Sequence, residues 1–166
     1  MNSLSIYDFH ITTKTYNVVE LENLGAKNVL FFNNAYDKYA YNNNVLIEAE
    51  KVKWRSDVSF LGGYEYDRYF QMNLLAKRGI KINIWGPGWE KIKKPHSNLK
   101  IYPGWVQAED AAKIFKSTKI NLHFLRKIAR DLQTTRTMEI PACGAFMLAE
   151  RTIEHENLFK EEIGRA

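Results

Sequence analysis

Three apolar segments of this chain each end at a turn that contains glycine. They are residues 57–61 before Gly62-Gly63, 80–85 before Gly86-Pro87-Gly88, and 99–102 before Pro103-Gly104. A short apolar run bounded by turn residues is typical of a buried strand, and strands that alternate with helical segments predict a parallel sheet. Parallel sheets bind ligands at the carboxyl ends of their strands. We therefore expect the glycine turns to gather along one ligand-binding edge.

The remaining pattern extends this alternation of strands and helices along the chain. The sequence predicts a three-layer Rossmann-like α/β fold, a parallel sheet with helices on both faces. Residues 33–54 are polar and rich in tyrosine, which predicts a loop or linker with at most a short helix. Helix 67–77 is expected to bury one face, formed by Tyr69, Phe70, Leu74 and Leu75. The other predicted strands are 10–12, 29–32 (buried), 119–124 and 145–148, and the other predicted helices are 16–24, 108–115, 135–143 and 153–159.

Composition narrows the class of protein. A chain of 166 residues with 45% hydrophobic and 26% charged residues fits one globular domain, or one domain and part of another. No apolar stretch is long enough for a transmembrane segment, and no signal peptide is expected at the start. A single cysteine, Cys143, fits a reducing compartment, so we expect a cytoplasmic protein. The net charge of +5 is compatible with phosphate ligands, but the basic residues are too dispersed to favour nucleic acid.

The segment 131–148 contains the most specific candidate residues. Glu139 falls early in a predicted helix, where its carboxylate can accept hydrogen bonds from a ribose diol, unless it is an ordinary surface Glu. Arg136 can pair with a diphosphate, or instead form a salt bridge with Asp131 or Glu139. Asp131 can contact sugar hydroxyls or cap the helix. Gly144 lies in the small-residue turn that follows.

Two earlier turns supply further candidates. Gly62 and Gly63 allow a ligand to approach the backbone closely, and the next helix offers unpaired N–H groups to a phosphate, although a plain tight turn explains the same residues. Arg68 lies about one helical turn further on and can reach a phosphate or be solvated. Trp105 and Val106 follow the Gly104 turn and can flank a nucleobase, or simply pack. The histidines show no metal-ligand spacing.

With these residues in view, the chain resembles the C-terminal half of glycosyltransferases of the GT-B fold. It is most similar to the bacterial spore-maturation-type branch, which is related to the group-1 retaining enzymes. The likeness covers about residues 57–162. It is carried by Asp57-Val58-Ser59-Phe60-Leu61-Gly62-Gly63, Ile82-Asn83-Ile84-Trp85-Gly86-Pro87-Gly88-Trp89, Tyr102-Pro103-Gly104-Trp105-Val106, Lys119-Ile120-Asn121-Leu122-His123-Phe124 and Arg136-Thr137-Met138-Glu139-Ile140-Pro141-Ala142-Cys143-Gly144.

The resemblance implies roles for these residues. Glu139 matches the acid that holds the ribose of a nucleotide-sugar donor, and Asp131 matches the acid near the donor sugar, where the wider superfamily commonly has Glu. Arg68 stands where a basic diphosphate contact is expected, whereas Gly63 replaces a residue that is often basic. Arg136 can compensate for that replacement. The implied set is Asp131 and Arg136 as catalytic residues, with Gly62, Gly63, Arg68, Trp105, Val106, Glu139 and Gly144 as donor-binding residues and no metal cofactor.

The resemblance also implies how the chain is divided. Residues 1–56 match the tail end of an N-terminal domain plus a linker, and residues 57–166 match a C-terminally truncated nucleotide-sugar-binding domain. The expected function is transfer of a sugar to an unknown acceptor (a glycan, a lipid or a protein), with the acceptor domain largely missing. The alternative is a non-catalytic nucleotide- or sugar-binding module. The tyrosine-rich linker and the missing domain make a homo-oligomer plausible.

Overall fold

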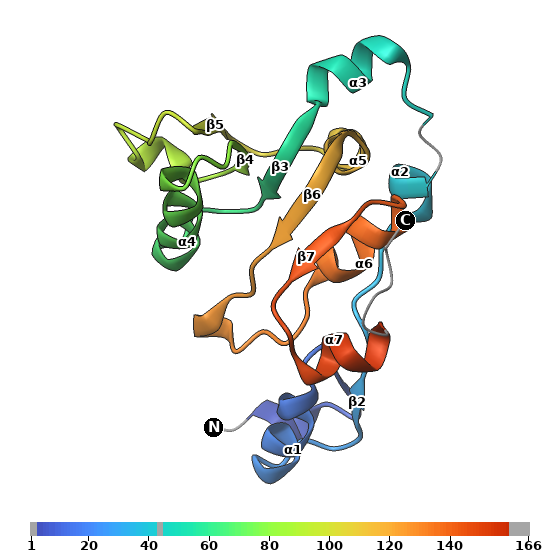
Figure 1. Ribbon diagram of the computed structural model, residues 1–166. Coiled ribbons are helices and arrows are strands. Elements are labelled where there is room, and N and C mark those ends of the chain that lie inside the picture. The colour runs from blue at the N-terminus through green and yellow to red at the C-terminus, as the bar shows by residue number, and fades with distance from the viewer. Residues whose placement is uncertain (1–2, 43–44, 160–166) are drawn as a thin grey trace.

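The fold is built around a five-stranded parallel sheet with the strand order β5-β4-β3-β6-β7 (Figure 1). The computed structural model describes residues 3–42 and 45–159. The strands are β3 (Ser56–Leu61), β4 (Ile82–Gly86), β5 (Leu99–Pro103), β6 (Thr118–His123) and β7 (Met147–Ala149). Every neighbouring pair is parallel. The order runs outward from β3 in both directions, which is the Rossmann arrangement and places the topological switch point between β3 and β6.

Helices cover both faces of this sheet, as the sequence predicted. On one face, α4 (Tyr66–Lys77) and the short η2 (Trp89–Lys91) pack a core that includes Phe60 of β3. On the other, α5 (Ala108–Ser117) and α6 (Thr135–Ala142) pack a core that includes the next residue, Leu61. Successive side chains of a strand point to opposite faces, so β3 is buried on both sides. The predicted α/β class is confirmed.

The buried face of α4 differs from the predicted one. Arg68, Met72 and Ala76 are buried, whereas Phe70 and Leu74 are 49% and 44% exposed. The inward stripe therefore follows the spacing of Arg68, Met72 and Ala76, four residues apart. Because Arg68 is charged, this stripe did not stand out as apolar in the sequence.

The segment 33–54 was predicted to be a loop or linker with at most a short helix, but its described residues contain two helices. They are α2 (Lys38–Asn42) and α3 (Glu48–Trp54). The ring of Tyr41 stacks on Phe115 of α5 with centroids 6.4 Å apart, and Glu50 of α3 forms an ion pair with Lys113 at 2.9 Å. Much of this segment is thus part of the packed α5 face.

Residues 3–32 form a separate N-terminal unit beside the main sheet (Figure 1). It contains η1 (Ser3–Ile6), the parallel strands β1 (His10–Thr12) and β2 (Val29–Phe31), and α1 (Thr15–Asn23). The predicted strands and helix are present, but β2 is not buried: Leu30 at its centre is 41% exposed. The last helix, α7 (Ile153–Leu158), lies next to this unit. No helix within the described ranges is long and apolar enough to cross a membrane.

Candidate functional site

The glycine turns meet along the carboxyl edge of the sheet, as expected from parallel strands. The Gly62 N–H donates to the Trp85 carbonyl at 2.9 Å, and the Gly104 N–H donates to the Gly86 carbonyl at 2.9 Å. The turns after β3, β4 and β5 are therefore joined through main-chain hydrogen bonds. These joined turns lie at the place where α/β sheets bind ligands.

Gly86 is required where two of these turns cross. Its φ is +141°, and a Cβ atom there would lie 2.1 Å from the Gly62 carbonyl oxygen. The buried indole of Trp89 donates a hydrogen bond to that same oxygen at 2.8 Å. The Gly62 turn is thus fixed from both sides, and its carbonyl faces the protein.

Arg68 connects the two strands that flank the switch point. Its guanidinium donates to the Gly63 carbonyl at 3.0 Å and to the Phe124 carbonyl at 3.4 Å, so it joins the ends of β3 and β6. The residue is only 8% exposed. Burial lowers the pKa of Arg68, while the charges of Glu65 and Asp131 act in the opposite direction. The side chain is therefore a buried cation, paired with Glu65 at 3.3 Å, rather than a solvated helix residue.

Arg136 and Glu139 lie together at the start of α6. Thr134 caps this helix, since its hydroxyl accepts a hydrogen bond from the Arg136 N–H at 3.2 Å. The Arg136 guanidinium forms an ion pair with the Glu139 carboxylate and donates from Nε to the Leu61 carbonyl at 3.4 Å. The Arg136 side chain is 31% exposed and that of Glu139 is 11% exposed. Arg136 thus places an accessible cation next to the end of β3.

Tyr41 of α2 is a neighbour of this pair that the sequence did not reveal. Burial, followed by the negative charge of Glu139, raises the pKa of Tyr41 to about 12. The phenol therefore stays protonated at neutral pH and is a hydrogen-bond donor beside the Glu139 carboxylate. No local sequence signal marks this residue, because its partners belong to α6.

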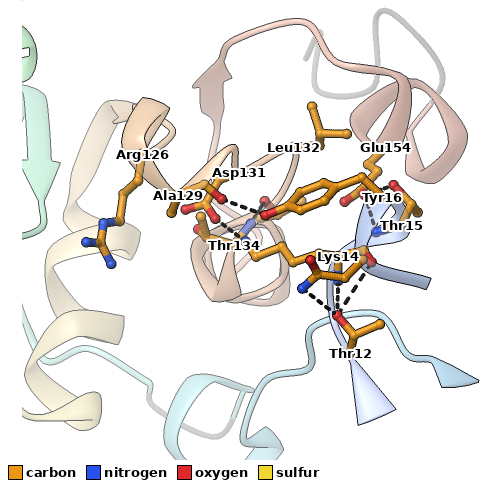
Figure 2. Close-up of polar contacts among 12 residues, drawn as sticks. Thr12, Lys14, Thr15, Tyr16, Arg126, Ala129, Asp131, Leu132, Thr134 and Glu154 are labelled. Atoms are coloured by element: carbon orange, nitrogen blue, oxygen red, sulfur yellow. Dashed lines mark hydrogen bonds and ion pairs between the residues drawn. The ribbon is translucent and has the colours of Figure 1, made fainter. Parts of the chain in front are cut away.

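Asp131 faces the N-terminal unit. It lies on the loop between β6 and α6, residues 124–134, and forms an ion pair with Lys14 (Figure 2). The Asp131 side chain is 6% exposed and that of Lys14 is 21% exposed. Asp131 does not cap α6, since Thr134 holds that position. The carboxylate is thus already paired with a cation from the other part of the chain.

Comparison with known families now decides the class of protein. The family described as glycosyl transferase-like matches residues 68–164. This chain belongs to the glycosyl transferase-like family. The match covers more than half of the chain and contains Arg68, Asp131, Arg136 and Glu139. No curated protein matches the chain.

In this glycosyl transferase-like domain, an aromatic cavity of about 390 Å³ lies beside the turn after β5. Trp105 and Val106 both line it, and Trp105 is 87% exposed. The rings of Trp85 and Tyr102 stack in its wall with centroids 5.0 Å apart. The cavity offers flat apolar surfaces to a planar ligand.

Gly144 is placed apart from the other candidate residues. It follows α6 and precedes β7, so it lies at the amino edge of the sheet. Its φ of +66° accounts for the glycine, because left-handed backbone is required to end the helix there. Across the described parts of the chain, no group of three His, Cys, Asp or Glu side chains is arranged to hold a metal ion.

A buried pair of imidazoles lies behind the start of α6. His123 Nε2 is 2.9 Å from the Thr134 hydroxyl, and His155 Nε2 is 3.0 Å from the Thr137 hydroxyl. The two rings meet edge to face with centroids 5.4 Å apart. The histidines show no metal-ligand spacing in the sequence, yet the fold brings these two together, beside Thr134 at the N-cap of α6 and Thr137 in its first turn.

The stability of the domain is expected to fall below neutral pH because of His123. Burial, and next the charge of His155, lower the pKa of His123 from 6.5 to about 3. Between pH 6.5 and about pH 3, His123 is protonated in the unfolded chain but neutral in the folded chain. The free energy of unfolding should therefore fall by up to about 1.4 kcal/mol for each unit by which the pH is lowered. Urea titrations should show that, between pH 6.5 and pH 5, the free energy of unfolding declines less steeply in His123→Gln than in the wild type. Equal slopes for His123→Gln and the wild type would contradict the assignment.

Proposed function

We propose that this chain is the donor-binding part of a glycosyltransferase and holds a nucleotide sugar at the carboxyl edge of its sheet. Membership of the family supports glycosyl transfer in general. The observation that carries the donor site is the convergence of Arg68 and Arg136 at the switch point. Both guanidiniums bind carbonyls at the end of β3, Arg68 at Gly63 and Arg136 at Leu61.

The diphosphate of the donor is proposed to lie over the Gly62-Gly63 turn. The helices α4 and α6 both begin at this edge, so their positive dipole ends favour an anion, and the first turn of α4 has no side-chain cap. Arg136 is the accessible cation, and Arg68 adds buried positive charge while it fixes the turn. These groups would stabilise the charge that develops on the departing diphosphate.

The remaining donor groups have candidate partners in the same arrangement. Glu139 is proposed to accept hydrogen bonds from the ribose diol, in exchange for part of its pairing with Arg136. Asp131 is proposed to contact the hydroxyls of the donor sugar. The nucleobase is proposed to enter the aromatic cavity beside Trp105 and Val106, where stacking contributes about 1–3 kcal/mol. Gly144 has no role in this proposal.

In the proposed reaction, an acceptor oxygen forms a bond to the anomeric carbon of the sugar. The bond from that carbon to the phosphate oxygen breaks, and the nucleoside diphosphate keeps its electron pair. The acceptor hydroxyl loses its proton to the departing diphosphate or to solvent. The proposal needs no metal cofactor, since the two arginines and the helix N-termini neutralise the diphosphate. The acceptor is a glycan, a lipid or a protein hydroxyl.

A non-catalytic nucleotide-binding module is the second candidate. The observation that favours it is that both carboxylates, Asp131 and Glu139, are paired with cations. A turnover assay discriminates between the two candidates. Transfer or hydrolysis of a nucleotide sugar by this chain would exclude the module, whereas binding without turnover would favour it.

Calorimetric titration tests the donor site. We expect the folded protein to bind at least one of UDP, GDP, ADP or dTDP, or one of their sugar conjugates, with a dissociation constant below the millimolar range. The heat should vanish after prior saturation with the same nucleoside diphosphate. A folded sample that binds none of these ligands at millimolar concentration would contradict the proposal.

A further inference from the structure

We propose that the N-terminal unit is a positioning element of the donor site, because it holds the loop 124–134 in the conformation that places Asp131. Lys14, Tyr16 and Glu20 are the residues that hold it. This inference rests on the proposed function, since it assigns the loop to the donor-sugar end of that site. It extends that function because it gives residues 14–20 a role in binding the donor, although these residues lie outside the family match.

Three consecutive residues of the loop are each bound by a different residue of the N-terminal unit. The Tyr16 hydroxyl donates to the Ala129 carbonyl at 2.8 Å, and Lys14 pairs with Asp131. Figure 2 shows Lys14 and Tyr16 both directed toward this part of the loop. Between them, the Arg130 guanidinium donates two hydrogen bonds to Glu20, each 2.7 Å long.

Arg130 shows that the loop needs this support. Its backbone has φ 50° and ψ 37°, the left-handed conformation that residues with a side chain seldom adopt. Such a conformation persists where the surroundings hold it. Here the surroundings are Glu20 and the ring of Tyr16, whose centroid lies 4.0 Å from the guanidinium carbon.

The helix that supplies these contacts is itself anchored to the main sheet domain. The Thr15 hydroxyl and N–H both donate to one carboxylate oxygen of Glu154 in α7, at 2.6 Å and 3.3 Å. Glu154 is 3% exposed. The start of α1 is thus fixed on one side by α7 and presents Lys14 and Tyr16 to the loop on the other.

The loop 124–134 leads directly into the start of α6, where the donor site is proposed. Three residues after Asp131, the loop reaches Thr134, which caps α6 and precedes Arg136. The charge of Asp131 also acts on Arg68, which joins the ends of β3 and β6. Loosening the loop should therefore weaken binding of the sugar end of the donor, whereas the nucleotide end is held by β3, α4 and α6.

Glu20→Gln tests this clamp because it removes the bidentate pair at an exposed position where the fold tolerates change. Asp57→Asn is the matched control, since it removes another exposed ion pair, with Lys119 at 2.7 Å, at the amino edge of the sheet. Hydrogen exchange measures the loop directly: the amides of Ala129, Arg130 and Asp131 all donate within it. Glu20→Gln should raise their exchange rates about fivefold and leave the amides of β3 and β6 unchanged.

Binding supplies the second readout, with the probe pairs UDP and UDP-glucose, GDP and GDP-mannose, and ADP and ADP-glucose. Glu20→Gln should weaken the nucleotide sugar about threefold or more relative to its diphosphate, and Asp57→Asn should change neither. Three results would each overturn the proposal. The first is unchanged exchange at residues 129–131, and the second is a rise in exchange over the whole sheet. The third is faster exchange at residues 129–131 with an unchanged affinity for the nucleotide sugar relative to its diphosphate. If the wild type binds no nucleotide, the proposed donor site fails, and the exchange result alone still decides whether the clamp exists.

Discussion

Replacing Gly86 with Ala is expected to lower the free energy of unfolding by about 2–6 kcal/mol. Two costs add, each about 1–3 kcal/mol: the strained backbone of a non-glycine residue at φ +141°, and the collision of the new Cβ with the Gly62 carbonyl. The obstacle is main chain of the neighbouring turn, so no side chain can move aside. Urea or thermal unfolding followed by circular dichroism measures the loss.

Gly79→Ala is the control that separates the two costs. Gly79 also has a positive φ, of +91°, but a Cβ there meets no atom within 4 Å. Its replacement should cost only about 1 kcal/mol, the backbone contribution alone. If Gly86→Ala were no more destabilising than Gly79→Ala, that result would contradict the close approach of the Gly62 carbonyl to Gly86.

Replacing Glu139 with Gln is expected to weaken binding of a nucleoside diphosphate by about 1–3 kcal/mol, or about fivefold to 150-fold. The ribose diol would lose a charged acceptor, and Arg136 would lose the partner that orients it. The amide has the same size as the carboxylate, so the fold should persist. Calorimetry with the tightest-binding diphosphate gives the ratio of dissociation constants.

Glu50→Gln provides the comparison for that variant. Glu50 is also paired with a cation, Lys113, on the same face of the sheet, but it belongs to α3 and not to the start of α6. Its replacement should leave nucleotide affinity unchanged. A Glu139→Gln protein that binds within twofold of the wild type would remove Glu139 from the proposed site.

The parts of this fold that the sequence predicted are those decided by local chemistry. The turns at Gly62-Gly63 and Gly86-Pro87-Gly88 could be placed because glycine marks a break wherever it follows an apolar run. Alternation of strand and helix then determined the class of sheet, and the parallel sheet brought the turns to one edge. The pairing of Arg136 with Glu139 was also foreseen as an alternative, since both lie on one helix face.

The parts that escaped prediction depend on contacts between distant segments. Arg68 is buried because it joins carbonyls of β3 and β6, and Lys14 pairs with Asp131 although 117 positions separate them in the chain. Tyr41 became a neighbour of Glu139 because the segment 33–54 folds against α5 and α6. A sequence pattern shows which residues are polar, but not which of them will meet.

The most direct test of the account is to locate the ligand on the sheet. Titration of isotope-labelled protein with UDP, GDP and ADP in turn, followed by amide chemical shifts, should give the largest changes at the carboxyl edge. We expect them at Gly62, Gly63 and Arg136. Two results would contradict a donor site at the switch point between β3 and β6. One is chemical-shift changes confined to the amino edge, at Asp57, Lys119 or Gly144. The other is no change with any of the three nucleotides.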